Sequence, residues 1–205
     1  AAINGLSAKE IASRVNAQSN YTGGVGARAE TYAFLSLGTA GTTQASVNFK
    51  LNGQSISAYS SSTASDVDGL VTAINDASGK TGVVAQKVDV PGSAGTFRVQ
   101  LFAADGSDIK IQEASVTTSN AAGATWGNAN IMTLQGAYDS NGTITAVAAT
   151  AAGATTAAGV ATLSVGASNS NRNATVGGRV LFTSDTSYTL ETSVGSSSGG
   201  LLNAT

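Results

Sequence analysis

The chain has 205 residues, with 10 Lys and Arg against 12 Asp and Glu, so its formal net charge is −2. Charged residues make up only 11% of the chain, against about 25% in an ordinary soluble domain, and the sequence contains neither His nor Cys. These counts exclude a clustered basic footprint for nucleic acid, a catalytic His or Cys, and His or thiolate metal sites. They also exclude haem and iron–sulfur ligation and any disulfide framework.

The length fits one large domain or two small ones. No apolar run approaches the ~20 residues that a membrane-spanning helix needs, so we expect no membrane contact. The chain begins AAINGLSAKE, with neither Met nor the basic and apolar regions of a signal peptide. We therefore expect it to be a segment of a longer polypeptide.

The first predicted element is an amphipathic helix that begins at Ser7. Glu10 follows three residues later, which is the spacing of a capping box. Apolar residues then recur at helical spacing, at Ala8, Ile11, Ala12 and Val15. The Thr22-Gly23 pair ends this segment, and a strand is predicted at about 25–37.

A β-hairpin is predicted next. Val47, Phe49 and Leu51 alternate with polar residues, which is typical of a half-buried strand. Asn52-Gly53 is the strongest short signal for a two-residue hairpin turn. The return strand continues through Ile56 and Ala58.

Residues 65–85 then repeat the pattern of residues 7–27. Ser65 and Asp68 have capping-box spacing, and an Asn follows the apolar stripe in both copies, at Asn16 and Asn75. Both copies continue with Thr-Gly and then Val-x-Ala. The second stripe consists of Val67, Leu70, Val71 and Ile74. The sequence therefore predicts an internal repeat built on a helix of about 65–78 followed by a strand.

Three strands are predicted after this helix, near 82–90, 96–103 and 107–112, with Asp105-Gly106 turning the last pair. The second copy is then a complete ββαβββ unit. Residues 179–191 resemble residues 98–110, so we predict that the C-terminal strands close the first copy by pairing with residues near 25–37.

This arrangement predicts two domains: residues 1–44 with 176–205 form a discontinuous proximal domain, and residues 45–175 an inserted distal domain. The Ala/Thr/Gly-rich stretch 113–175 is predicted to form short strands around an Asn141-Gly142 turn, or alternatively a linker, with Trp126 as a core anchor. The predicted fold class is α+β, with two small modules, each an antiparallel sheet with one packed helix, and this β-rich stretch.

Residues that carry chemistry do not assemble into a catalytic pattern. Ser107 and Lys110 match S-x-x-K, but that motif needs a helix, and we predict a strand there. Asp66 and Asp68 are acids that favour a helix N-terminus. Asp105 and Asp108 belong to a turn that lacks the remaining ligands of a calcium loop. We therefore expect no catalytic, cofactor-binding or metal-binding residues, and no enzymatic activity.

Hydroxyl-rich loops and Asn-x-Thr sequons are the candidate modification sites. Four sequons begin at Asn20, Asn141, Asn173 and Asn203, which matter only where the oligosaccharide-transfer machinery exists. A Ser/Thr run is predicted to be a solvated loop that can accept O-linked glycans. It consists of Ser60, Ser61, Ser62 and Thr63.

The repeat resembles the variable outer region of bacterial flagellins. Residues 73–85, AINDASGKTGVVA, carry the resemblance most clearly, and Ser7–Ala12 with Val15-Asn16 carry it again. The C-terminal GGRVLFTSDTSYTL is similar to the strand pair that returns from a flagellin outer domain. The resemblance covers about 1–112 and 177–205, and filament caps and hook-associated proteins share the same repeat.

This resemblance implies a structural role for the chain, as the surface-exposed outer domains of a flagellin subunit on the filament outside the cell. Its partners would be neighbouring flagellin subunits, with antibodies or host surfaces at the outside, and no cofactor. The long terminal helices that polymerise flagellin are not part of this sequence, so we expect the isolated segment to be a monomer. A glycan- or surface-binding adhesin or phage-tail module is the alternative.

Overall fold

A computed structural model describes residues 6–18, 24–37, 45–61, 66–118, 132–146, 160–163, 172–184 and 187. The helices are α1 (Ala8–Ala17), α2 (Asp68–Asp76) and α3 (Ser78–Thr81). The first strands are β1 (Gly26–Leu37), β2 (Ala45–Leu51), β3 (Gln54–Ser61), β4 (Val84–Asp89), β5 (Phe97–Ala103) and β6 (Ile109–Thr118). The others are β7 (Met132–Ser140), β8 (Thr143–Ala146), β9 (Val160–Leu163), β10 (Ala174–Val176) and β11 (Arg179–Thr183).

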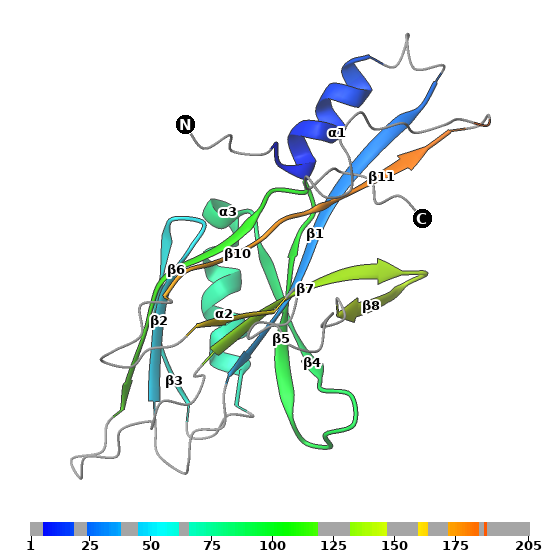
Figure 1. Cartoon of the computed structure of the whole chain (residues 1–205). Coiled ribbons are helices and arrows are strands. Elements are labelled where there is room, and N and C mark those ends of the chain that lie inside the picture. Colours follow the sequence, from blue (N-terminus) through cyan, green and yellow to red (C-terminus); the bar gives the residue numbers. More distant parts are fainter. Residues whose placement is uncertain are drawn as a thin grey trace, which may run out of the picture.

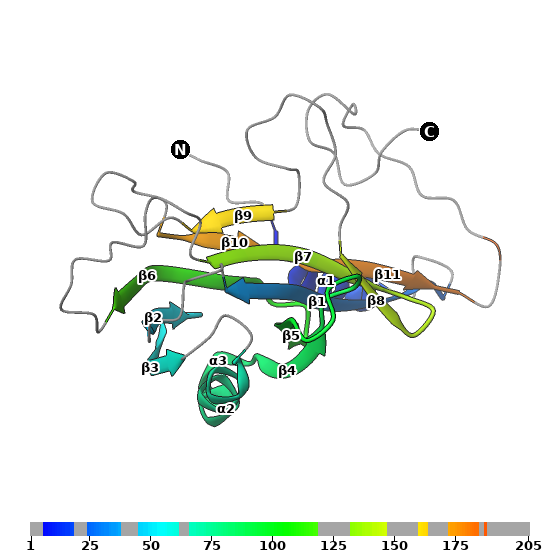
Figure 2. The ribbon, with the colours of Figure 1, turned by 90° about the horizontal axis from the view of Figure 1, so that it is seen from below.

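In the described part of the chain, the strands form two antiparallel sheets with short helices packed on them, which confirms the predicted α+β class (Figure 1). The larger sheet has the order β4-β5-β1-β7-β8, with β11 also paired to β1 and β9 to β7. The smaller sheet has the order β10-β6-β2-β3. Figure 2 shows α2 and α3 together on one side of β1 and β7.

Strand β1 pairs with the C-terminal strand β11 at its start and with the central strands β5 and β7 further along. Its first residues pair with β11, from Gly26↔Thr183 to Glu30↔Arg179, and its later residues pair with β5 on one edge and β7 on the other. The predicted pairing of the 25–37 strand with the C-terminal segment is therefore confirmed over residues 179–183. The division into two domains stays a prediction. Strand β1 belongs to the predicted proximal domain, but its residues Ala33 and Leu35 are part of the main core, which is built mostly from the predicted distal domain.

The main core lies between the two sheets and α2. Leu70 and Ile74 of α2, with Val67 just before it, are fully buried, as the apolar stripe predicts. They pack with buried residues of β1 to β3, β5 to β7, β9 and β10. Fully burying one such side chain contributes about 1.5–3 kcal/mol. A smaller cluster of Ala8, Ala12 and Ala29 lies where α1 packs on β1.

The two helices begin differently. Ser7 caps α1 as predicted: its Oγ accepts the Glu10 N–H at 3.3 Å, and the Glu10 carboxylate accepts the Ser7 N–H at 2.8 Å. The capping box predicted for Ser65 and Asp68 is wrong. Ser65 lies outside the described residues, and helix α2 begins at Asp68 itself, behind Val67, with no side-chain cap. Asp68 is therefore the first helical residue, two positions before the third one that a capping box uses, and its carboxylate pairs with Lys87 instead.

Asp105-Gly106 is not a hairpin turn, which corrects a second prediction. Strand β5 pairs with β1 and β4, whereas β6 pairs with β2 and β10, so the chain crosses here from one sheet to the other. Gly106 is buried with φ +72°, and a Cβ at this position would overlap Ala29, whose carbonyl carbon lies 2.9 Å away. The glycine is needed because the crossing segment passes directly against β1.

The Asn-Gly turns predicted at 52–53 and 141–142 both form. Asn52 and Gly53 have φ of 49° and 83°, and Asn141 and Gly142 have φ of 54° and 83°. Positive φ at both central positions is the requirement of the type I′ turn, whose twist matches that of the strands. The first turn joins β2 to β3 and the second joins β7 to β8. The stretch 113–175 thus supplies strands to both sheets, while Trp126 lies outside the described residues.

Candidate functional site

The helix–strand unit that carries the flagellin resemblance is held by one Asn in each copy. In the first copy, the Asn16 carboxamide donates to the Ala27 carbonyl and accepts the Ala27 N–H, both at 2.8 Å. In the second copy, Asn75 donates to the Ala85 carbonyl at 3.0 Å and accepts the Ala85 N–H at 2.8 Å. We call this reciprocal pair of hydrogen bonds the Asn clamp. It fixes the end of each helix to the strand that follows.

The strand that closes each unit also has the same register in both copies. Two residues after the clamped alanine, Ala29 pairs with Val180, and Lys87 pairs with Val99. One residue further, Glu30 pairs with Arg179, and Val88 pairs with Arg98. The Arg-Val dipeptide of β11 thus occupies the position on β1 that the Arg-Val dipeptide of β5 occupies on β4. The internal repeat is therefore a repeat of structure as well as of sequence.

The two copies differ in what covers their helices. Leu70 and Ile74 of α2 are fully buried, because α2 packs against β3 as well as β4. Ile11 and Val15, at the corresponding positions of α1, are only half-buried. Helix α1 packs on β1 and β11 (Figure 1). The first copy is thus the less deeply buried of the two.

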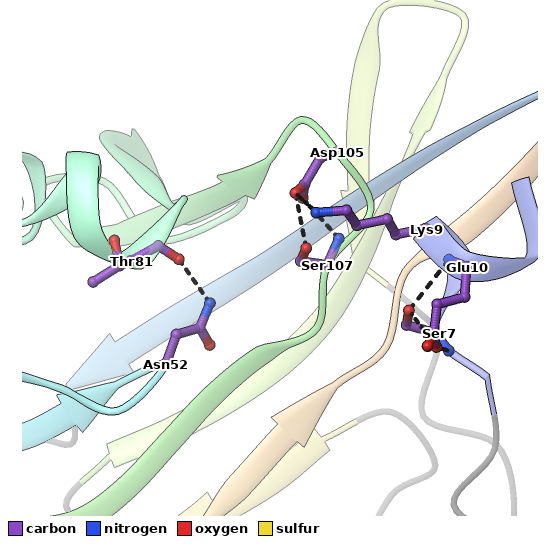
Figure 3. A network of polar contacts seen from close by, with 7 residues as sticks. All are labelled: Ser7, Lys9, Glu10, Asn52, Thr81, Asp105 and Ser107. Carbon is purple, nitrogen blue, oxygen red and sulfur yellow. Dashed lines mark hydrogen bonds and ion pairs between the residues drawn. The ribbon is translucent and has the colours of Figure 1, made fainter. Parts of the chain in front are cut away.

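A polar junction ties α1 to the crossing segment between the sheets (Figure 3). Lys9 Nζ donates to Asp105 Oδ2 at 2.8 Å, and the Lys9 N–H donates to the Gly106 carbonyl at 3.3 Å. The Ser107 N–H and hydroxyl both donate to the same carboxylate, each at 2.9 Å. The hydrogen bond from Lys9, followed by those from Ser107, lowers the pKa of Asp105 to about 2. Asp105 is therefore ionised at neutral pH and acts as a fixed acceptor.

The Asn52 side chain forms hydrogen bonds that join the β2–β3 turn to α3 and to β6. Its Nδ2 donates to the Thr81 carbonyl at 2.9 Å (Figure 3). Its Oδ1 accepts the Lys110 N–H at 2.8 Å. Its own backbone N–H donates to the Lys110 carbonyl at 2.9 Å. The residue that sets the hairpin turn therefore also holds that turn against the rest of the module.

Two open grooves flank α1. One has a volume of about 430 Å³, and its lining includes Leu6, Ile11 and residues 177–180. The other has a volume of about 700 Å³ and contains Glu10, Asp108 and Lys110. Hydrogen bonds from Ser7 lower the pKa of Glu10, and Lys110 Nζ lies 3.6 Å from the Asp108 carboxylate. These charged groups are placed as ion pairs and caps.

The structure separates the residues of the catalytic and metal motifs. Ser107 precedes β6 and donates its hydroxyl to Asp105, whereas Lys110 pairs with Asp108, so the S-x-x-K match does not form a hydroxyl–amine pair. Asp68 pairs with Lys87. Within the described ranges, no three Asp or Glu side chains come close enough to hold a metal ion.

The predicted modification sites are only partly described. Ser60 and Ser61 are not in a loop but end strand β3, opposite Ser46 and Ala45, because the hairpin ladder extends further than the alternation of apolar residues suggested. Ser62 and Thr63 lie outside the described residues, as do the sequons at Asn20 and Asn203. Asn141 lies in an exposed turn, and the Asn173 Oδ1 accepts the Glu113 N–H at 3.0 Å.

Sequence reasoning missed a buried carboxylate on β1. Glu30 is 4% exposed, and one of its oxygens accepts from Arg28 Nη2 at 3.0 Å. Its Oε1 has no hydrogen-bond partner in the described part of the chain. Burial, and after it the charge of Glu30, raises the pKa of Tyr32. A signal was present in the sequence, because Glu30 shares a strand face with Tyr32 and Phe34, where a charged residue is unusual.

No helix in the described ranges has both the length and the apolar character to cross a membrane.

No family model matches the chain, and no curated protein matches it. It has a distant structural similarity to the crystal structure of the flagellar cap protein FliD, domains D1-D2-D3, from Escherichia coli, with a TM-score of 0.27 and 16% identity. The match covers 80% of this chain and 52% of that chain, so it spans about half of the cap structure. Similarity at this level does not assign a family.

Proposed function

We propose that the chain forms the solvent-facing outer domains of a bacterial flagellin subunit, at the surface of the filament outside the cell. The observation that carries the proposal is the repeated helix–strand unit. The residues that make the sequence similar to flagellin outer regions are the ones that build this unit. Asn75 makes the clamp, the Thr81 hydroxyl accepts the Val83 N–H at 3.2 Å, and Gly82 takes φ +70° to end α3.

The composition supports a surface role of this kind. Charged residues make up 11% of the chain, and several of them form ion pairs on the surface, such as Lys9–Asp105 and Lys50–Glu113. Like charges repeated on crowded identical neighbours repel one another, whereas hydroxyl groups hydrate the surface without that cost. The partners in this proposal are neighbouring flagellin subunits, and the role is structural rather than catalytic.

The test is the composition of filaments sheared from the native cells. We expect peptides of this chain to occur in one-to-one proportion with peptides of the major filament protein, because they belong to the same polypeptide. Recovery of these peptides from the cell envelope, with none in the filaments, would contradict the proposal. An adhesin would be favoured by two results together: these peptides are found in the cell envelope and not in the filaments, and the isolated segment binds a defined glycan saturably in calorimetry.

A further inference from the structure

Two Asn-Gly turns lie in the described residues, and they have nearly equal φ angles but different surroundings. The Asn52 carboxamide is held at both ends, by the Thr81 carbonyl and the Lys110 N–H. Asn141 is exposed, and its carboxamide has no hydrogen-bond partner in the part of the chain that the structure describes. The Gly142 N–H after it donates to Asp139 Oδ1 at 2.7 Å. The described part of the chain therefore offers a matched pair of Asn-Gly dipeptides, one with a tethered carboxamide at Asn52 and one exposed at Asn141.

We infer that Asn141 is a site of spontaneous deamidation and that Asn52 is protected from the same reaction. In this chemistry the Gly142 backbone nitrogen attacks the Asn141 side-chain carbonyl carbon, and a nitrogen–carbon bond forms. The side-chain nitrogen takes a proton and leaves as ammonia, so a cyclic imide remains. Water then opens the imide to aspartate or isoaspartate. The reaction needs no oxidant and no partner other than water.

Asp139 is placed to take part in the first step. Its carboxylate already accepts the hydrogen of the attacking nitrogen at 2.7 Å, which is within the reach required of a general base. The proton removed from Gly142 nitrogen is the one that the departing ammonia finally carries. Glycine as the attacking residue has no Cβ to crowd the approach, and Gly142 has open space around it.

Deamidation here changes both the charge and the geometry of the turn. Either product adds a carboxylate close to Asp139. The isoaspartate product also adds one methylene group to the main chain of a two-residue turn, and the Ser140↔Thr143 pairing depends on that turn length. Strand β8 lies at the end of the larger sheet and pairs with β7 alone among the described strands. We therefore expect this modification to loosen β8 while leaving the core intact.

The experiment follows both sites in one sample. The full chain is incubated at mildly alkaline pH, and peptide mapping measures the aspartate and isoaspartate that form at positions 52 and 141. We expect the folded chain to react at least about tenfold faster at Asn141, the ratio that corresponds to about 1.4 kcal/mol for releasing the tethered Asn52 carboxamide. In urea the two dipeptides are equally free, so the rates should converge. Equal rates in the folded chain, or a difference that persists in urea, would overturn the inference.

The Asp139→Asn variant tests the role of the carboxylate. Asparagine retains an oxygen that can accept the Gly142 N–H, but it loses the charge that takes the proton. We expect slower deamidation at Asn141 and an unchanged rate at Asn52, which also reports that the fold is intact. An unchanged or faster rate at Asn141 would overturn the role assigned to Asp139.

Discussion

The Asn clamp makes a quantitative prediction for the second helix–strand unit. Asn75→Ala removes two hydrogen bonds, to the Ala85 carbonyl and from the Ala85 N–H. At a net value of about 0.5–1.5 kcal/mol for each bond, the free energy of unfolding should fall by about 1–3 kcal/mol. Asn75 is exposed, so water can replace part of the loss, and the lower half of this range is expected. Urea unfolding followed by circular dichroism measures the change.

Two further variants make this prediction specific. Asn75→Asp keeps the oxygen that accepts the Ala85 N–H and loses only the donor, so we expect a smaller loss than for alanine. Asp76→Ala changes the neighbouring exposed residue of α2, which is not part of the clamp, and should change the free energy of unfolding by no more than about 0.5 kcal/mol. An Asn75→Ala midpoint equal to that of Asp76→Ala would refute the idea that the clamp holds the helix to the strand.

Three further expectations concern the core, the crossing segment and the surface. Leu70→Ala should lower the free energy of unfolding by about 2–5 kcal/mol, because Leu70 is fully buried; an unchanged urea midpoint would show that α2 does not pack there. Gly106→Ala should cost more than the ~1–2 kcal/mol of a left-handed backbone, because its Cβ would also overlap Ala29; a melting temperature like that of the native chain would contradict this close approach. Asp105 has a folded pKa of about 2, below its ordinary 3.8, so its stabilising effect is present above pH 3.8 and is lost as the pH falls towards 2. The stability difference between the native chain and Asp105→Asn should shrink over that range, and a difference independent of pH would argue against the Lys9 pairing.

The glycan hypothesis has a test of its own. If the Ser60–Thr63 run accepts O-linked sugars, the intact mass of the parent protein from its native cells exceeds the mass of its sequence. Peptide mapping then places the added mass on this run. An unmodified intact mass would eliminate the hypothesis.

Local features of the fold were the most predictable. The type I′ turn requires positive φ at both central positions, which Asn and Gly adopt at little cost, so the hairpins at 52–53 and 141–142 could be predicted from two residues each. The stripe of Val67, Leu70 and Ile74 identified the buried face of α2, because helical spacing places these side chains on one face. The strand at 179–183 could be paired with β1 because its sequence repeats that of β5.

Contacts between segments far apart in the sequence could not be predicted from short sequence patterns. Asp105-Gly106 has the composition of a hairpin turn, but the conformation of Gly106 is required by its contact with Ala29, far away in the sequence. Alternation of apolar residues identifies a strand but does not say which strand it pairs with. The recurrence of Asn16 and Asn75 was visible in the sequence, but their shared role depends on a strand that returns to the end of the helix.

The proposed function predicts one location most directly. Antibodies raised against this chain, applied to native cells and viewed by immuno-electron microscopy, should label flagellar filaments evenly along their whole length, because every subunit would carry these domains on its outside. Label confined to the filament tip, or spread over the cell surface with bare filaments, would contradict the assignment of this chain to the outer domains of flagellin.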